Sequence, residues 1–172
     1  MRKGLLALLP LAALLAACWQ STAPLIPDDE ADSPKVAGKY KEADSGATVT
    51  ITKDAGGYFD YNKVDSGGSV TRRQIRFDHL QGDYYLVQSR TVTVTGDLET
   101  PYYRIVKLAK SAIEEYDVAC DAAEVAFEGV TASSGDCTFT AYRGLKDAAN
   151  ARVARFLGGD AASLTWQGTY RK

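Results

Sequence analysis

The stretch Thr48-Val49-Thr50-Ile51-Thr52 decides the fold class of this chain, because it alternates β-branched apolar residues with threonines. Successive side chains of a strand point to opposite faces, so Val49 and Ile51 share one face and the threonines share the other. The turn Asp54-Ala55-Gly56-Gly57 follows and leads into the aromatic run Tyr58-Phe59-Asp60-Tyr61. Together these segments predict a β-hairpin.

The same pattern continues for another sixty residues. Runs rich in β-branched and aromatic residues alternate with turns at 65–69, 81–83 and 96–97; the runs are 74–78, 84–87, 91–95, 102–108 and 113–118. Regular turn spacing of this kind favours an antiparallel meander over a parallel α/β sheet. We therefore predict a mainly β fold that forms a small barrel or a strongly curved sheet.

The last third of the chain has a helical period. Apolar residues fall on one face between about residues 141 and 157, with Thr140 as the expected N-cap and Gly158-Gly159 as the stop. A last strand should follow, in which Leu164, Trp166 and Tyr170 share a face. Trp166 is then expected to plug the core.

Composition describes an ordinary globular protein. The chain has 172 residues, 45% of them hydrophobic and 24% charged, with 20 Lys and Arg against 22 Asp and Glu. This length favours one domain, which we place at 36–172. The balance of charge excludes a dedicated nucleic-acid binder, which would carry a clear basic excess.

The first 17 residues read as a signal peptide. Arg2 and Lys3 precede Leu5 to Ala17, a stretch of 13 uncharged residues. As a helix it would rise about 20 Å, which is too short to cross a hydrocarbon core of roughly 30 Å. A cleaved export signal is therefore favoured over a transmembrane anchor.

The sequence Leu15-Ala16-Ala17-Cys18 that ends this stretch resembles the lipobox of bacterial lipoproteins. The resemblance implies cleavage before Cys18 and attachment of diacylglycerol to its sulfur, which would anchor the protein in the cell envelope. Trp19 stands where an Asp would signal retention in the inner membrane, so the outer membrane, facing the periplasm, is implied in a Gram-negative source. The alternatives are an ordinary signal peptide that contains a cysteine, or a cysteine buried in a core.

Residues 18–35 are predicted to combine the lipidated cysteine with a flexible tether. The segment Gln20 to Lys35 holds three prolines and four clustered acids but no apolar period. Such a composition is typical of a linker. The tether would hold the globular domain away from the lipid surface.

Cys120 and Cys137 are the two remaining cysteines. Exported chains meet an oxidising compartment, so we predict a disulfide between them. A metal or redox pair is the alternative, although the chain has a single histidine.

The sequence shows no catalytic constellation, and we expect no cofactor and no metal site. His79 follows Asp78 at the end of a predicted strand, where neighbours point to opposite faces, so Asp78 is poorly placed to orient it. Glu114 and Glu115 should diverge for the same reason, and Asp60 could meet Asp78 only by cross-strand pairing.

Two surfaces are candidates for binding. Arg72, Arg73 and Arg76 are the only basic concentration, which is either a patch for phosphate or a sugar-acid polymer or a solvated strand face. The tyrosine-rich strands offer a candidate ligand or partner face, which we assign to three residues: Tyr61, Phe77 and Trp166.

The segments Gly38-Lys39-Tyr40 and Gly82-Asp83-Tyr84-Tyr85, with a helix before one last strand, are loosely similar to the lipocalin plan. That family forms an eight-stranded barrel around a small apolar ligand. Tyr40 stands where the family's first motif has Trp, and Gly82 where its second usually has Thr. Residues 120–136 have no clear counterpart in the family.

The favoured function is a lipid-anchored, non-enzymatic envelope lipoprotein that binds a protein or polymer partner. The alternative is a lipocalin-like carrier of a small hydrophobic ligand, with an enzyme as a third reading. A carrier needs an interior cavity of about 300 Å³ or more. Its expected lining is Phe59, Tyr61, Ile75, Phe77, Leu86 and Trp166.

Overall fold

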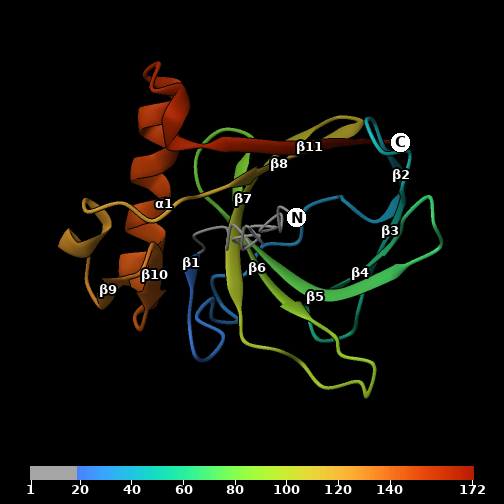
Figure 1. The fold of residues 1–172 in the computed structure, drawn as a ribbon, viewed down its shortest axis with the longest axis horizontal. Helices are drawn as coiled ribbons and strands as arrows, with labels where there is room; N and C mark the ends of the chain where they lie inside the picture. Colours follow the sequence, from blue (N-terminus) through green and yellow to red (C-terminus); the bar gives the residue numbers. More distant parts are fainter. Residues whose placement is uncertain (1–18) are drawn as a thin grey trace, which may run out of the picture.

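The computed structural model describes residues 19–172, in which eight antiparallel strands close into a barrel (Figure 1). The strands follow the chain order around the barrel, and the last pairs with both its predecessor and the first. They are β2 (Gly38–Glu42), β3 (Thr48–Lys53), β4 (Phe59–Val64), β5 (Val70–His79), β6 (Tyr84–Thr91), β7 (Tyr102–Ala109), β8 (Ala112–Asp117) and β11 (Thr165–Arg171). The predicted antiparallel meander is confirmed, and the sheet closes.

One predicted strand is wrong. Residues 91–95 were expected to form a β-rich run, but β6 ends at Thr91 and a turn follows. The amide of Thr93 donates to the carbonyl of Asp97 at 2.8 Å, and Gly96 has a φ of 92°. This tight turn leaves Val94 fully exposed. Val92 still forms a single antiparallel bridge with Leu98, and its amide donates to the carbonyl of Arg72 at 2.9 Å. The β propensity of the rest of the run is overridden because the chain reverses at this turn.

Three short strands extend the sheet outside the barrel. They are β1 (Trp19–Gln20), β9 (Val130–Ser133) and β10 (Asp136–Phe139), and a 3₁₀ turn, η1 (Glu124–Ala126), precedes β9. Strand β1 pairs antiparallel with β7 and parallel with β10. It occupies the edge of β7 beyond the point where the pairing of β7 with β8 ends.

The predicted flexible tether is therefore wrong for residues 19–35. Trp19 and Ile26 are buried, and the amide of Asp32 donates to the carbonyl of Phe77 at 2.8 Å. The backbone of residues 25 and 26 donates to the side chain of Gln88 on β6. Prolines and acids gave the segment the composition of a linker, but backbone pairing and two apolar anchors hold it on the barrel. The predicted signal peptide, residues 1–17, and Cys18 lie outside the described residues.

The predicted helix is α1 (Tyr142–Leu157), followed by a 3₁₀ turn, η2 (Ala161–Ser163). Thr140 does not cap it: Ala141 is the N-cap residue, and the hydroxyl of Thr140 donates to the carbonyl of Gly129 instead. The predicted stop is confirmed, since Gly158 ends the helix and Gly159 has a φ of 101°. No helix within residues 19–172 is long and apolar enough to cross a membrane.

The barrel wall separates two apolar clusters. One fills the barrel interior and includes Val49, Phe59, Ile75 and Phe77. The other lies between the outer face of β6, β7 and β8 and the elements that cover it: β1, β9, β10 and α1. In Figure 1, α1 stands on the left of the barrel, and β2 to β5 curve on the right. Strands β6 to β8 are thus buried on both faces.

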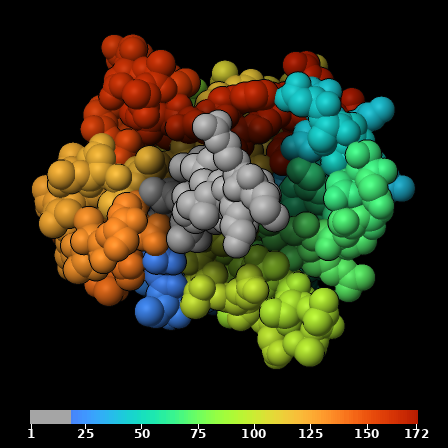
Figure 2. Space-filling model, viewed as in Figure 1, coloured from blue at the N-terminus to red at the C-terminus, as the bar shows by residue number. Residues whose placement is uncertain are grey.

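The alternating strand directions define two ends of the barrel. The mouth end carries the turns 43–47 and 65–69 and the loop 92–101; the far end carries the turns 54–58, 80–83 and 110–111. Figure 2 looks onto the mouth end, where the cyan, green and yellow-green segments of the three connections stand in front. The chain segment 34–36 crosses the far end, where Val36 joins the interior cluster.

Candidate functional site

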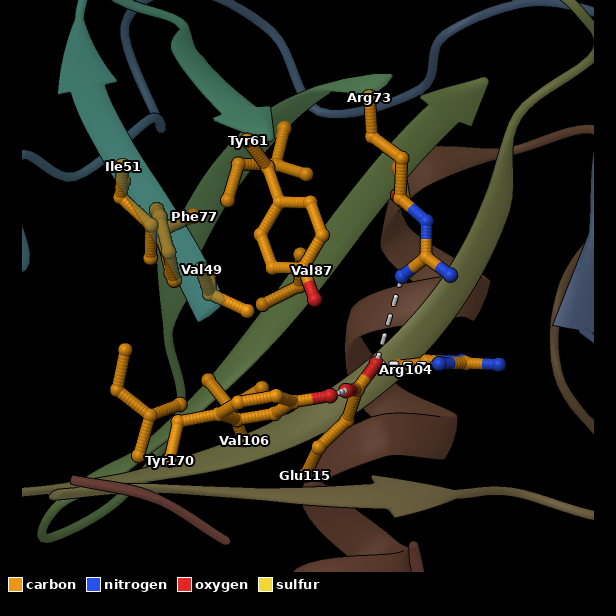
Figure 3. A pocket seen from close by; sticks show the side chains of 13 residues that line it. Val49, Ile51, Tyr61, Arg73, Phe77, Val87, Arg104, Val106, Glu115 and Tyr170 are labelled. Atoms are coloured by element: carbon orange, nitrogen blue, oxygen red, sulfur yellow. Dashed lines mark hydrogen bonds and ion pairs between the residues drawn. The ribbon is translucent and has the colours of Figure 1, made fainter. Parts of the chain in front are cut away.

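A cavity of about 40 Å³ lies inside the barrel, toward the mouth end. Inward-facing residues of all the barrel strands but β2 line it, and most are apolar: Val49, Ile51, Ile75, Phe77, Val87, Val106 and Ile113. Polar side chains gather on one side (Figure 3), where Tyr61, Arg73, Arg104, Glu115 and Tyr170 converge. The site is an apolar cup with a charged rim.

Glu115 is the centre of the rim. Its carboxylate accepts a hydrogen bond from Arg104 Nη1, lies 3.8 Å from Arg73 Nη1, and accepts a bond of 2.9 Å from the hydroxyl of Tyr170. Arg104 also forms an ion pair with Asp117, with Nε 2.8 Å from Oδ1. Adjacent strands supply these groups: β7 carries Arg104, and β8 and β11 carry the others apart from Arg73 on β5.

The electrostatics of the rim keep Glu115 ionised. Burial alone would raise its pKa, but Arg104 and then Arg73 outweigh burial and hold the pKa below the usual range of a glutamate. Burial raises the pKa of Asp117 despite its pairing with Arg104. The phenol of Tyr170 has a raised pKa because it is buried beside the Glu115 carboxylate.

Three buried polar atoms of the cup have no hydrogen-bond partner among residues 19–172. They are Nε of Arg73, the hydroxyl of Ser89 and the hydroxyl of Tyr61, which interacts with the phenol of Tyr170 without forming a hydrogen bond of normal geometry. Tyr61 is 7% exposed and Ser89 2% exposed, and burial raises the pKa of Tyr61 to about 12. Because an unpaired buried polar group is costly, these atoms favour a polar occupant of the cavity.

The chemistry available to the cup is that of hydrogen bonding and ion pairing. A carboxylate with a lowered pKa and two arginine partners is a weak base, so Glu115 is unsuited to proton abstraction. The arginines and phenols can donate to an anionic or hydroxylated group. Among the residues that the structure describes, no three His, Cys, Asp or Glu are grouped so that they could hold a metal ion.

The structure divides the predicted ligand face. Tyr61 and Phe77 line the cavity, as does Ile75, and Phe59 lies in the interior cluster. Leu86 lies instead in the outer cluster. The prediction was wrong there because both faces of β6 are buried, so its apolar residues do not show which face points inward. Trp166 lies outside the barrel and is 51% exposed.

A β-bulge explains the error at Trp166. The register of β11 against β8 shifts between Trp166 and Gly168. Tyr170 points into the barrel, and without the bulge Trp166 would have done the same by its even spacing. The predicted core plug is therefore a half-exposed side chain near the mouth end.

The arginine cluster is not a patch. Arg73 points into the cup, whereas Arg76 is 3% exposed on the outer face and donates to the carbonyl of Ile26 at 3.0 Å and to Asp28 at 2.6 Å. Only Arg72 is exposed. The residues of β5 alternate between faces, and residues 19–35 cover part of the outer one, so neither a basic patch nor a solvated strand face is formed.

The expectations about acid–base pairs hold. His79 is exposed, while Asp78 is buried and accepts hydrogen bonds from Tyr142 and Lys146 of α1. Glu114 points outward to Tyr116, away from Glu115. Asp60 pairs across the sheet with Gln74, so it does not reach Asp78.

The predicted disulfide bond between Cys120 and Cys137 is present, with the two Cα atoms 5.2 Å apart.

The sequence analysis did not identify Arg104, Ser89 and Tyr170 as residues of the site. Arg104 could have been found from the sequence, because it alternates with Val106 and Leu108 along β7 and their side chains therefore point to the same face. A charged residue among apolar residues that face the interior marks a polar position in a barrel.

Comparisons with protein-family models, curated proteins and solved structures found no match for this chain.

Proposed function

We propose that this chain is a lipid-anchored, non-enzymatic protein of the bacterial cell envelope, and that its barrel binds a protein or polymer partner. The observation that carries the partner-binding part is the filled interior. A cavity of about 40 Å³ falls well short of the roughly 300 Å³ expected for a small-molecule pocket. A partner that binds this barrel is therefore engaged by its outer surface.

The lipid anchor rests on the sequence Leu15 to Cys18, and the disulfide fits export to an oxidising compartment. Trp19 directly after Cys18 points to the outer membrane. Because Trp19 is fully buried, a lipid on Cys18 would leave no flexible linker between the barrel and the membrane. The barrel would then rest at the membrane surface rather than on a spacer.

Metabolic labelling with a fatty acid tests the anchor. The native chain should take up label and fractionate with membranes, and Cys18→Ala should abolish both. The matched control is the double variant Cys120→Ser, Cys137→Ser, which retains Cys18 and should still be labelled. Persistent labelling of Cys18→Ala, or an unlabelled native chain, would refute the anchor.

A small-ligand carrier is the second candidate, favoured by the three unpartnered polar atoms of the cup. A ligand would have to present a polar group to Tyr61, Arg73 and Ser89, and the cavity would have to widen. Native mass spectrometry of the Cys18→Ser chain without its signal peptide tests this. A retained small molecule supports the carrier, while the bare protein mass supports the outer-surface partner.

A further inference from the structure

The far end of the barrel carries a second hollow, separate from the cup. Its volume is about 270 Å³, and it lies where the segment 34–36 crosses the barrel next to the β7–β8 turn. The hollow is wider than the interior cavity and open to solvent. Its floor is apolar and aromatic: Val36, Tyr40, Tyr85, Leu108 and Ile113.

The floor is held in place by the fold. The hydroxyl of Tyr40 donates to the carbonyl of Val36 at 2.7 Å, which fixes the crossing segment against β2. The ring of Tyr85 packs edge-on against Phe77 and against His79, with ring centroids 6.3 Å and 5.1 Å apart. These contacts preorganise a surface on which a flat or apolar group can pack.

Three exposed lysines surround this floor: Lys35, Lys110 and Lys172. Among the described residues, no acidic side chain lines the hollow itself; burial raises the pKa of the Tyr85 phenol, and Asp32 and Asp83 are close enough to raise it further. None of the ion pairs between residues 19–172 involves these lysines. Lys172 Nζ lies 3.4 Å from the carbonyl of Ala37 and 5.3 Å from the ring centroid of Tyr40.

This concentration of positive charge runs against the charge of the whole chain, which has an acidic excess of two. A concave surface lined by one sign of charge focuses the electrostatic potential and attracts counter-charged ligands. Ammonium groups bind phosphate as point charges, and a phosphomonoester carries about −1.5 to −2 at neutral pH. Three lysines match such a group better than they match a single carboxylate.

We propose that the far-end hollow binds a phosphate group carried on a small ring or apolar moiety, with Lys35, Lys110 and Lys172 holding the phosphate and Tyr40 and Tyr85 contacting the moiety. The site goes beyond the proposed partner binding, because a small metabolite as well as a polymer can carry this group. It does not depend on the lipid anchor. A free phosphorylated metabolite and a phosphate-bearing envelope polymer share this chemistry.

The test is NMR titration of the isotope-labelled Cys18→Ser chain, without its signal peptide, using three probes: phenyl phosphate, inorganic phosphate and polyphosphate. Phenyl phosphate should give saturable shifts at Tyr85 and residues 110–112. Binding should weaken with salt, because the attraction is screened. Tighter binding of polyphosphate would indicate a polymer source, and tighter binding of phenyl phosphate would indicate a small metabolite.

The double variant Lys35→Gln, Lys110→Gln should weaken phenyl phosphate binding by about tenfold or more. The control is Arg72→Gln, which removes one exposed charge at the mouth end and should leave binding unchanged. All three side chains are exposed, so the fold should persist, and the spectra report it directly. No saturable shift, an equal loss in Arg72→Gln, or equal affinity for inorganic and phenyl phosphate would overturn the proposal. None of these outcomes depends on whether Cys18 is lipidated.

Discussion

Arg152 of α1 and Glu124 of η1 form a bidentate ion pair, with Nε 2.8 Å from Oε1 and Nη2 2.6 Å from Oε2. Both residues are buried, at 3% and 1% exposure. Arg152 Nη2 also donates to the carbonyl of Ala119 at 2.7 Å. One guanidinium thus joins the helix to both the chain that follows β8 and the disulfide-closed segment.

Glu124→Gln should lower the free energy of unfolding by about 3 kcal/mol, because the buried Arg152 charge loses its only buried ionic partner within residues 19–172. It keeps the partly exposed carboxylate of Asp121, whose Oδ2 lies 2.9 Å from Nη2. Urea unfolding at neutral pH measures this. Arg143→Gln is the control, since Arg143 is 82% exposed and its Nε lies 3.9 Å from Asp147, and it should cost less than about 0.5 kcal/mol. Similar values for the two variants would show that the buried pair does not hold the helix.

Trp19 provides a test of the packed N-terminal segment. Trp19→Ala should cost about 3–5 kcal/mol, because the ring is fully buried and lies 5.0 Å from Phe139 between ring centroids. The matched control is Trp166→Ala, which removes a half-exposed ring and should change stability by less than about 1 kcal/mol. Equal and small effects would indicate that residues 19–35 are a tether after all.

The bond between Cys120 and Cys137 closes a loop with a sequence separation of 17. Chain entropy assigns about 3 kcal/mol to a loop of this length, so Cys120→Ser with Cys137→Ser should lower stability by that order. Thermal unfolding with and without reductant measures it, and reductant should leave the double variant unaffected. Non-reducing peptide mapping that found both thiols free would contradict the bridge.

Alternation and turn chemistry predicted most of the barrel because strands β2, β3 and β4 each have one buried face and one face exposed to solvent. Thr48 to Thr52 is such a case: Val49 and Ile51 lie in the interior cluster, and the pattern reads the same in the structure. The helix was found for a similar reason, since one side packs on β6 and β10. These are local signals that tertiary packing reinforces.

Other features depended on contacts that no local pattern encodes. Strand β6 is apolar on both faces, so the side of Leu86 was not readable. The bulge before Gly168 turned Trp166 outward. Trp19 and Ile26 are isolated apolar residues in a proline-rich segment, and only the free edge of β7 and the outer cluster explain their burial.

The Glu115 cluster predicts a pH dependence. The pKa of Glu115 is lower in the folded protein than its ordinary value of 4.5, so ionisation favours the folded state. Its contribution is fully present above about pH 4.5 and is lost as the pH falls through the lower folded pKa. Glu115→Gln should cost about 3 kcal/mol at pH 7, because it leaves Arg104 and Arg73 without their carboxylate.

The measurement is the difference in unfolding free energy between the native chain and Glu115→Gln from pH 7 to pH 3. Other groups titrate in both proteins, so their effects largely cancel. The difference should narrow below pH 4.5. A constant or widening difference would show that the arginines do not stabilise this carboxylate.

Gly144 gives a prediction whose sign opposes helix propensity. Alanine is favoured over glycine in helices, by up to about 1 kcal/mol in the interior, and Gly144 lies in the first turn of α1. At Gly144 an added Cβ would lie 1.9 Å from the carbonyl oxygen of Glu128 and 2.8 Å from its carbon, so α1 or the backbone before β9 must move. Gly144→Ala should therefore lower the free energy of unfolding by about 2 kcal/mol or more.

The control is Arg143→Ala, one position away and exposed, which should leave the free energy of unfolding unchanged or raise it slightly. If Gly144→Ala proved the more stable protein in urea, the close approach of the helix to residue 128 would be refuted, since only that approach reverses the usual preference.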